Sequence, residues 1–183
     1  MLRESDMLKA AQELQVPVAV IKAVCEVEAP RGGFLPTGEP IILFERHIFS
    51  RLTNRRYDAR HPDISNKSPG GYGPSSAQHA RLQKAVRLDR LAALKSASWG
   101  RFQILGLNHV QAGFTSMQDF INAMYRDEQS HLEAFVNFIK NDRRLLNALQ
   151  NFDWAAFARI YNGPAYRINR YDTKLQLAYH RYA

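Results

Sequence analysis

Cysteine is nearly absent from the sequence, since the 183 residues contain a single one, Cys25. A lone cysteine excludes an internal disulfide framework and a cysteine-based zinc site. No apolar run approaches the roughly 20 residues that a membrane-spanning helix needs. The opening residues Met1-Leu-Arg-Glu-Ser-Asp6 lack the apolar stretch of an ordinary signal peptide. We therefore expect a soluble protein that is made in a cytoplasm.

Acidic residues are also few relative to basic ones. The sequence has 17 Asp and Glu residues and 25 Lys and Arg residues, which gives a net charge of +8. Such a charge favours a polyanionic partner, such as nucleic acid, a membrane surface or an anionic cell-wall polymer. The length and the 45% hydrophobic content suit one domain with a real core, and we expect residues 1–183 to form it.

Hydrophobic periodicity predicts mostly helix. We expect helices over residues 5–15 and 17–29, and four or five more after a loop rich in Gly and Pro at residues 53–76. The candidate helix caps are Ser5 or Asp6, Ser75 or Ser76, Thr115 or Ser116, and Asp153. Between these parts, Pro36-Thr-Gly38 is a turn signal, and the apolar run that follows has the length of a strand. We therefore predict a predominantly α-helical α+β fold with a small β-hairpin near residues 33–46.

Glu28 is the residue with the most chemical information. At about 100° per residue, it shares the apolar side of its helix with Ile21 and Val24. Glu26 falls on the opposite side, where Lys22 is expected to pair with it. Burial among apolar side chains raises a carboxyl pKa, which a general acid near neutral pH requires. The ordinary alternative is a helix-end Glu that reaches water, and this segment alone favours that alternative.

Two later segments strengthen the first interpretation. In Ser96-Ala-Ser-Trp-Gly-Arg-Phe-Gln-Ile-Leu-Gly106, small residues allow close backbone approach, and Gln103 offers a donor and an acceptor beside apolar neighbours. Tyr161-Asn162-Gly163 combines a phenol and an amide with the glycine that commonly ends a helix. Each segment alone is weak evidence, because a Tyr-Asn-Gly sequence is equally compatible with a simple helix stop.

In this order the segments resemble the lysozyme-like superfamily, which includes goose-type lysozymes and soluble lytic transglycosylases. The sequence motifs are most similar to those of the N-acetylmuramidase domain of phage endolysins. The matching segments are Glu26-Val-Glu28, Gly33-Phe34, Ile42-Leu-Phe-Glu45-Arg-His47, Ser98-Trp-Gly-Arg-Phe-Gln103 and Phe157-Ala-Arg-Ile-Tyr-Asn-Gly163. The resemblance runs from about residue 10 to the C-terminus. One departure is Ala29, where the related motif usually has Ser after the catalytic Glu.

The resemblance implies a lysozyme-like fold that cuts the β-1,4 bond between N-acetylmuramic acid and N-acetylglucosamine. It implies that Glu28 is the general acid, and Glu26 then serves as a surface control. Gln103, Tyr161 and Asn162 would position the acetamido group of the sugar and support Glu28. Ser98 belongs to the same matching segment and is a candidate substrate-binding residue.

A glycosidase usually needs a second carboxylate. Glu45, at the end of the apolar run, is the first candidate; the equal alternative is that it pairs with Arg46 or Arg51 and braces the hairpin. Asp58 and Asp63 are further candidates. His47 is more typical of a hydrogen-bonded structural histidine than of a ligand, because no other histidines lie at metal spacing. The sequence therefore predicts no metal and no other cofactor.

Two other functional classes remain open. A lytic transglycosylase has a related fold, uses one Glu and forms a 1,6-anhydro product. A nucleic-acid binder would explain the charge, but the basic residues are scattered and accompany no recognised motif. The small basic domain resembles endolysins of phages from Gram-negative hosts, which reach the wall through a holin-type route. The expected partners are then peptidoglycan glycan strands and an anionic outer-membrane surface, with no nucleic acid, and the protein is expected to be a monomer.

The C-terminal helix predicted over residues 171–179 has two possible roles. Leu175, Ala178 and Tyr179 share one face, with Lys174 and Arg181 near its edges. That face either packs on the domain core, which we favour, or attaches to a membrane surface.

Overall fold

The computed structural model describes residues 2–28 and 32–183. Its first part contains α1 (Glu4–Leu14), α2 (Val18–Glu28), β1 (Ile42–Phe44) and α3 (Arg46–Leu52). Its middle part contains η1 (Ser75–Ala77), α4 (Gln78–Val86), α5 (Arg90–Lys95), β2 (Ala97–Trp99), β3 (Ile104–Leu105) and η2 (Gly106–Asn108). Its last part contains α6 (Met117–Arg126), α7 (Glu128–Lys140), α8 (Arg143–Gln150), α9 (Trp154–Tyr161), η3 (Pro164–Arg167) and α10 (Tyr171–Tyr182).

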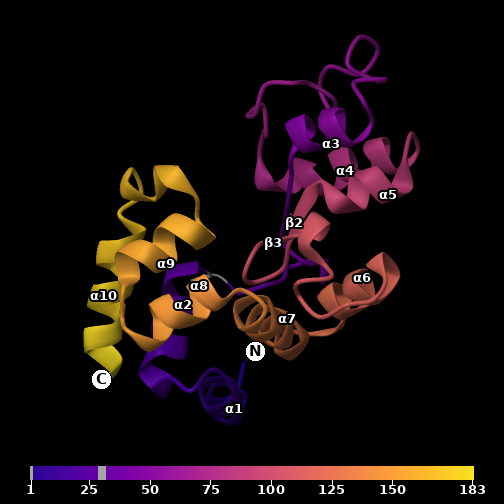
Figure 1. The fold of residues 1–183 in the computed structure, drawn as a ribbon. Coiled ribbons are helices and arrows are strands. Elements are labelled where there is room, and N and C mark those ends of the chain that lie inside the picture. The colour runs from indigo at the N-terminus through magenta and orange to yellow at the C-terminus, as the bar shows by residue number, and fades with distance from the viewer. Residues whose placement is uncertain (1, 29–31) are drawn as a thin grey trace.

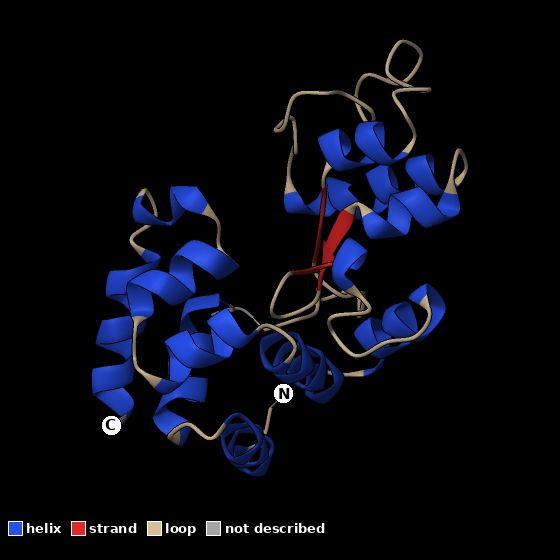
Figure 2. Cartoon of the chain, in the orientation of Figure 1, coloured by secondary structure: helices blue, strands red, loops and turns tan. Residues whose placement is uncertain are grey.

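The elements form two groups with α7 between them (Figure 1). One group joins the two ends of the chain, since α10 packs on both α2 and α9, and α1 packs on α2. The other group contains α3, α4, α5 and the strands, which Figure 2 draws in red. Helix α7 contacts α1 and α8 on one side and α6 on the other. Glu28 ends α2 in the first group, whereas Gln103 precedes β3 in the second.

Side-chain caps explain where several helices begin. Ser116 Oγ accepts a hydrogen bond from the Asp119 amide at 3.1 Å, and Asp153 accepts one from the Ala156 amide at 2.9 Å. These contacts confirm the caps predicted at Ser116 and Asp153. The other two cap predictions were wrong, because α1 already begins after Arg3 and η1 begins after Pro74. Asp127 caps α7 in the same way, with 2.7 Å between its Oδ1 and the Ser130 amide nitrogen. Each such cap is worth about 1 kcal/mol.

The sheet differs from the predicted hairpin. Only the bridge between Phe34 and Pro40 closes a local turn near residues 33–46. Strand β1 instead pairs antiparallel with β2, with Ile42 opposite Trp99, and β2 pairs with β3. Helix α3 already begins at Arg46. The predicted local turn is therefore present, but periodicity could not identify the partner of β1, because that partner lies far away in the sequence.

Aromatic side chains fill the core beside the strands. Trp99 is fully buried, and its indole Nε1 donates a hydrogen bond to the Leu94 carbonyl at 3.1 Å. Phe102, in the turn between β2 and β3, stacks on Phe135 of α7 with 4.6 Å between the ring centroids. This contact fixes the turn on α7, and the turn therefore has a defined position relative to both groups.

The C-terminal helix packs inward. Leu175 and Ala178 are both fully buried, which confirms the expectation that this face covers the core. Residues 53–74 contain turns without a helix or strand, as the sequence predicted. Within the described residues, no helix is both long enough and apolar enough to cross a membrane. The expected end of α2 beyond Glu28, including Ala29, lies outside the described residues.

Candidate active site

Glu28 is the last residue of α2 and lies on its buried side. Val24 and Ile21, one and two turns earlier, are fully buried, and Glu28 itself is half-buried. The Asn162 side-chain amide donates to both carboxylate oxygens, at 3.2 Å and 3.3 Å. Burial raises the pKa of Glu28 to about 7, and the Asn162 hydrogen bond and the charge of Lys174 oppose this rise. A carboxyl group with this pKa carries a proton for about half the time at neutral pH.

The negative charge of Glu28 also affects the pKa values of two tyrosines in the same region. Burial raises the pKa of Tyr161 well above its usual value, and the negative charge of Glu28 raises it further. The pKa of Tyr171 is raised for the same two reasons. Tyr171 begins α10, and Lys174 follows one turn later. Glu28 therefore lies among side chains from α9 and α10, more than 130 positions away in the sequence.

Tyr161 and Asn162 have different local roles. The Tyr161 hydroxyl donates to the Phe102 carbonyl at 2.7 Å, and its ring stacks on Phe157 with centroids 5.3 Å apart. Tyr161 thus ties the end of α9 to the turn between β2 and β3. Asn162 uses its Nδ2 on Glu28, whereas its Oδ1 is buried without a hydrogen-bond partner among the described residues. That oxygen is an available acceptor next to the candidate acid.

Gln103 supports the backbone of the turn. Its Nε2 donates to the Gly100 carbonyl at 2.9 Å and to the Ile41 carbonyl at 3.3 Å. Gln103 has a φ of 50°, a left-handed conformation that non-glycine residues seldom adopt. Ser98, on β2, lies opposite Leu43 and Leu105 and is half-buried. Gln103 therefore orders the turn, and Ser98 lies on the adjacent strand.

Glu45 is the residue immediately before α3, and its side chain is only 15% exposed. One of its oxygens lies 3.3 Å from His47 Nδ1, and the Tyr72 hydroxyl also interacts with it. Among the ion pairs of the described residues, none joins Glu45 to Arg46 or Arg51, the partners expected from the sequence. Arg46 instead donates to the carbonyl of Ser68 at 3.2 Å, in the long loop. The sequence could not show this, because the loop that captures Arg46 is brought there by tertiary folding.

Residues 17–183 match the family model described as Muramidase, N-acetylmuramidase. The chain belongs to the N-acetylmuramidase family. A crystal structure of Burkholderia AP3 phage endolysin is 43% identical in sequence, with a TM-score of 0.93. The similarity covers 99% of this chain and 70% of that endolysin. No match is found among curated proteins.

Membership of this family makes the chain a glycoside hydrolase that acts on peptidoglycan. It confirms the resemblance drawn from the sequence segments, and the similarity to the endolysin structure confirms the predominantly helical α+β fold. The nucleic-acid-binding alternative therefore has no support.

Asp58 and Asp63, the two further candidates for the second carboxylate of the muramidase, make other contacts. Asp58 accepts hydrogen bonds from Ser50 at 2.9 Å and from Ser65 at 2.5 Å, which hold the long loop on α3. Asp63 pairs with Lys84 at 2.7 Å on the surface. Both residues stabilise the loop. Among residues 2–28 and 32–183, no cluster of three or more His, Cys, Asp and Glu side chains has the arrangement of a metal site.

Glu26 is a surface residue in the muramidase, but with other partners than expected. It pairs with Arg181 and accepts a hydrogen bond from the Tyr182 hydroxyl at 2.8 Å. Lys22, the expected partner, pairs with Glu4 at 2.7 Å. The difference arises because α1 and α10 pack on both sides of α2 and supply closer charges than the helix itself.

Sequence reasoning missed several residues around the candidate acid. Tyr171 and Lys174 were not assigned to the site, although Tyr171 precedes the buried Leu175 by one helical turn and therefore shares its face. Glu128 and His131 of α7 were not considered at all. Their only sequence signal was their place among the apolar residues of a helix whose buried side also carries Ser130.

Proposed function

We propose that this muramidase is an endolysin that hydrolyses the β-1,4 bond between N-acetylmuramic acid and N-acetylglucosamine, with Glu28 as the general acid. The supporting observation is the raised pKa of Glu28, about 7, at the partly buried end of α2. Cleavage of a glycoside requires a protonated carboxyl group at the glycosidic oxygen. A carboxyl group with an ordinary pKa would be almost fully ionised at neutral pH and could not fill this role.

Asn162 is proposed to hold Glu28 and to contact the substrate. Its Nδ2 reaches both carboxylate oxygens, so the amide limits the rotation of the carboxyl group. Its Oδ1 has no partner among the described residues and is suited to accept the N–H of a sugar acetamido group. We propose that Gln103, Tyr161 and Ser98 complete the substrate-binding region, chiefly because the first two hold the turn between β2 and β3.

We propose Glu45 as the second carboxylate, which activates water or stabilises the oxocarbenium ion. It is largely shielded from solvent, and its Oε2 makes no hydrogen bond among the described residues despite the nearby His47. Such an oxygen is free to accept a proton from water. Hydrolysis then leaves a reducing muramic acid end, whereas a transglycosylase would leave a 1,6-anhydro end.

The experiment compares Glu28→Gln with Glu26→Gln on purified peptidoglycan. Gln keeps the shape of the side chain but cannot donate the catalytic proton, so Glu28→Gln should lose activity by at least about a hundredfold. Glu26→Gln makes the same chemical change on the other side of α2 and should be nearly as active as the wild type. Near-normal activity of the Glu28 variant would contradict the proposal.

Mass spectrometry of the released fragments gives the second measurement. Reducing ends are expected, and 1,6-anhydromuramic acid ends would contradict hydrolysis. The similarity to Burkholderia AP3 phage endolysin supports a role in lysis of the host cell. We propose that residues 1–183 act as one monomeric catalytic domain on the periplasmic wall, which they reach from the cytoplasm through a holin-type route.

A further inference from the structure

Helix α7 begins with two buried polar side chains that the proposed reaction does not use. Glu128 is 8% exposed and His131 is 1% exposed, one helical turn apart. Neither residue belongs to the candidate site, and buried charges of this kind need specific partners. Both residues face two backbone segments, Gly32–Gly33 and the turn between β2 and β3. We call this pair the α7 clamp.

Glu128 connects three parts of the chain. Its Oε1 accepts the Gly33 amide at 2.7 Å and Arg101 Nη1 at 3.2 Å, and its Oε2 accepts the Leu2 amide at 3.1 Å. Although burial raises the pKa of Glu128, the Gly33 hydrogen bond and the Arg101 charge lower it below its usual value. The residue therefore acts as a charged acceptor, and charge-assisted hydrogen bonds of this type are stronger than neutral ones.

His131 holds the same two segments as a neutral ring. Its Nδ1 accepts the Arg101 amide at 3.0 Å, and its Nε2 donates to the Met124 carbonyl at 2.8 Å. Burial lowers the pKa of His131, although the nearby carboxylates Asp127 and Glu128 oppose this change. The ring also stacks on Phe34, with centroids 4.9 Å apart. These hydrogen bonds require a neutral imidazole ring, and burial favours the same neutral state.

The fit between the clamp and the two segments leaves no room for a side chain. A Cβ atom added to Gly33 would lie 2.5 Å from His131 Nδ1, and one added to Gly100 would lie 2.8 Å from His131 Cε1. A Cβ atom on Gly32 would lie 2.9 Å from Glu128 Oε1. Real Cβ contacts are longer than this, so the glycines allow the backbone to lie directly against α7.

The clamp contacts residues that lie near Glu28 in the sequence or in the fold. The Gly33 amide, which donates to Glu128, follows Glu28 by five positions. Arg101, held by both clamp residues, acts on Cys25, one turn before Glu28, where its charge opposes the rise of the Cys25 pKa that burial causes. The clamp therefore acts on Cys25 of α2 through Arg101, and it holds Gly33, five positions after Glu28 in the sequence.

We propose that Glu128 and His131 are positioning residues for the muramidase reaction: they fix Gly32–Gly33 and the turn between β2 and β3, and so keep Glu28 in its water-poor position. This inference rests on the proposed role of Glu28 as general acid. Loss of the clamp should let water reach Glu28 and move its pKa down towards the ordinary value of a Glu. The alkaline limb of the kcat/KM profile reports that pKa.

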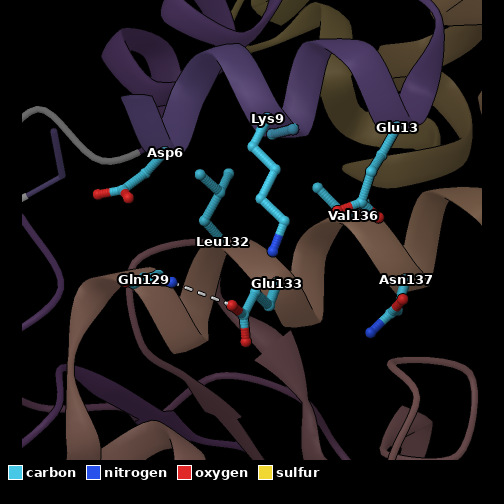
Figure 3. A pocket seen from close by; sticks show the side chains of 9 residues that line it. Asp6, Lys9, Glu13, Gln129, Leu132, Glu133, Val136 and Asn137 are labelled. Carbon is cyan, nitrogen blue, oxygen red and sulfur yellow. Dashed lines mark hydrogen bonds between the residues drawn. The ribbon is translucent and has the colours of Figure 1, made fainter. Parts of the chain in front are cut away.

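Glu128→Gln and Gly33→Ala test the proposal from opposite sides. The first variant removes the charge of the clamp, and the second pushes the loop away from His131 without any change of charge. The matched control is Glu133→Gln, which makes the same charge change on α7. Glu133 is exposed, accepts a hydrogen bond from Gln129 at 3.2 Å and lines a groove against α1 (Figure 3).

Both test variants should shift the alkaline limb to lower pH by at least about half a unit and reduce kcat more than they change KM. The control should keep the wild-type profile. Lys174, Tyr161 and Tyr171, which share an electrostatic interaction with Glu28, are unchanged in all three variants. A shift shared by Glu128→Gln and Gly33→Ala therefore reports the access of water to Glu28, because Gly33→Ala changes no charge.

Thermal melting separates positioning from simple destabilisation. If both variants melt at lower temperature but keep the wild-type alkaline limb below that temperature, the clamp only stabilises the fold and the inference is overturned. Glu28→Gln is measured alongside. An active Glu28→Gln would reject the proposed function itself, whereas an inactive one together with unshifted clamp variants would reject the clamp alone.

Discussion

Ionisation of Glu28 should destabilise this muramidase measurably. Its pKa rises from an ordinary 4.5 to about 7 in the folded protein, chiefly through burial. The folded state therefore holds a proton on Glu28 in a pH range where the unfolded chain has already released it. Stability falls with rising pH wherever the folded state binds more protons. The favourable contribution is complete below pH 4.5 and is lost as the pH rises through about 7.

The size of the effect follows from the difference between the two pKa values. A pKa difference of about 2.5 units corresponds to a change of about 3 kcal/mol in the free energy of unfolding. Glu28→Gln has no ionisable group at this position, so this contribution to its free energy of unfolding does not change over the same pH interval. The stability of this variant relative to the wild type should therefore increase by about 3 kcal/mol between pH 4 and pH 8.5. In a chain of this length, such a change corresponds to a melting temperature difference of about 6–12 °C.

Denaturant unfolding of both proteins at matched pH values is the direct assay. The difference between their free energies of unfolding should change steadily between about pH 4.5 and pH 7 and level off above pH 7. The alkaline limb of the wild-type kcat/KM profile should fall at the same pH, because the general acid must be protonated. Stability curves that stay parallel from pH 4 to pH 8.5 would refute the reasoning, since they would show an ordinary surface carboxyl group.

Three further predictions concern the second carboxylate, cofactors and charge. Glu45→Gln should strongly reduce turnover with a melting temperature close to that of the wild type; a lower melting temperature with retained activity would show a bracing role. Activity should survive EDTA, since carboxylate-based hydrolysis needs no metal; a loss restored by zinc or calcium would contradict this. Lysis of permeabilised Gram-negative cells should fall as NaCl increases, while cleavage of a short neutral muroglycan changes little, because salt screens exposed charges; equal sensitivity would exclude capture by the basic surface.

Local features of the sequence were sufficient for much of the fold and for the acid itself. Helical pitch alone placed Glu28 on the side of Ile21 and Val24, which are fully buried. The caps at Ser116 and Asp153 depend on contacts three residues apart, so they too can be read locally. Periodicity and capping succeed because both the signal and the structure that it predicts lie within one or two helical turns.

The parts that escaped prediction depend on distant segments. Strand β1 pairs with β2, whose residues lie more than 50 positions later, and no feature of residues 33–46 specifies that partner. The environment of Glu45 is set by Tyr72 and His47 rather than by the neighbouring arginines. Glu128 is an ordinary helix residue in the sequence and becomes significant only because Gly33 and Arg101 are brought against it.

The raised pKa of Glu28 belongs to this second category. The helix α2 provides an apolar side, but an apolar side of an isolated helix would still face water. Burial comes from α9 and α10, and Asn162 arrives with the end of α9. Because this packing buries Glu28, ionisation of Glu28 lowers the free energy of unfolding by about 3 kcal/mol. At alkaline pH, the aromatic core and the contacts of α7 must offset that loss. The pKa of Glu28 is therefore a direct measure of how well the two ends of the chain and α7 are assembled.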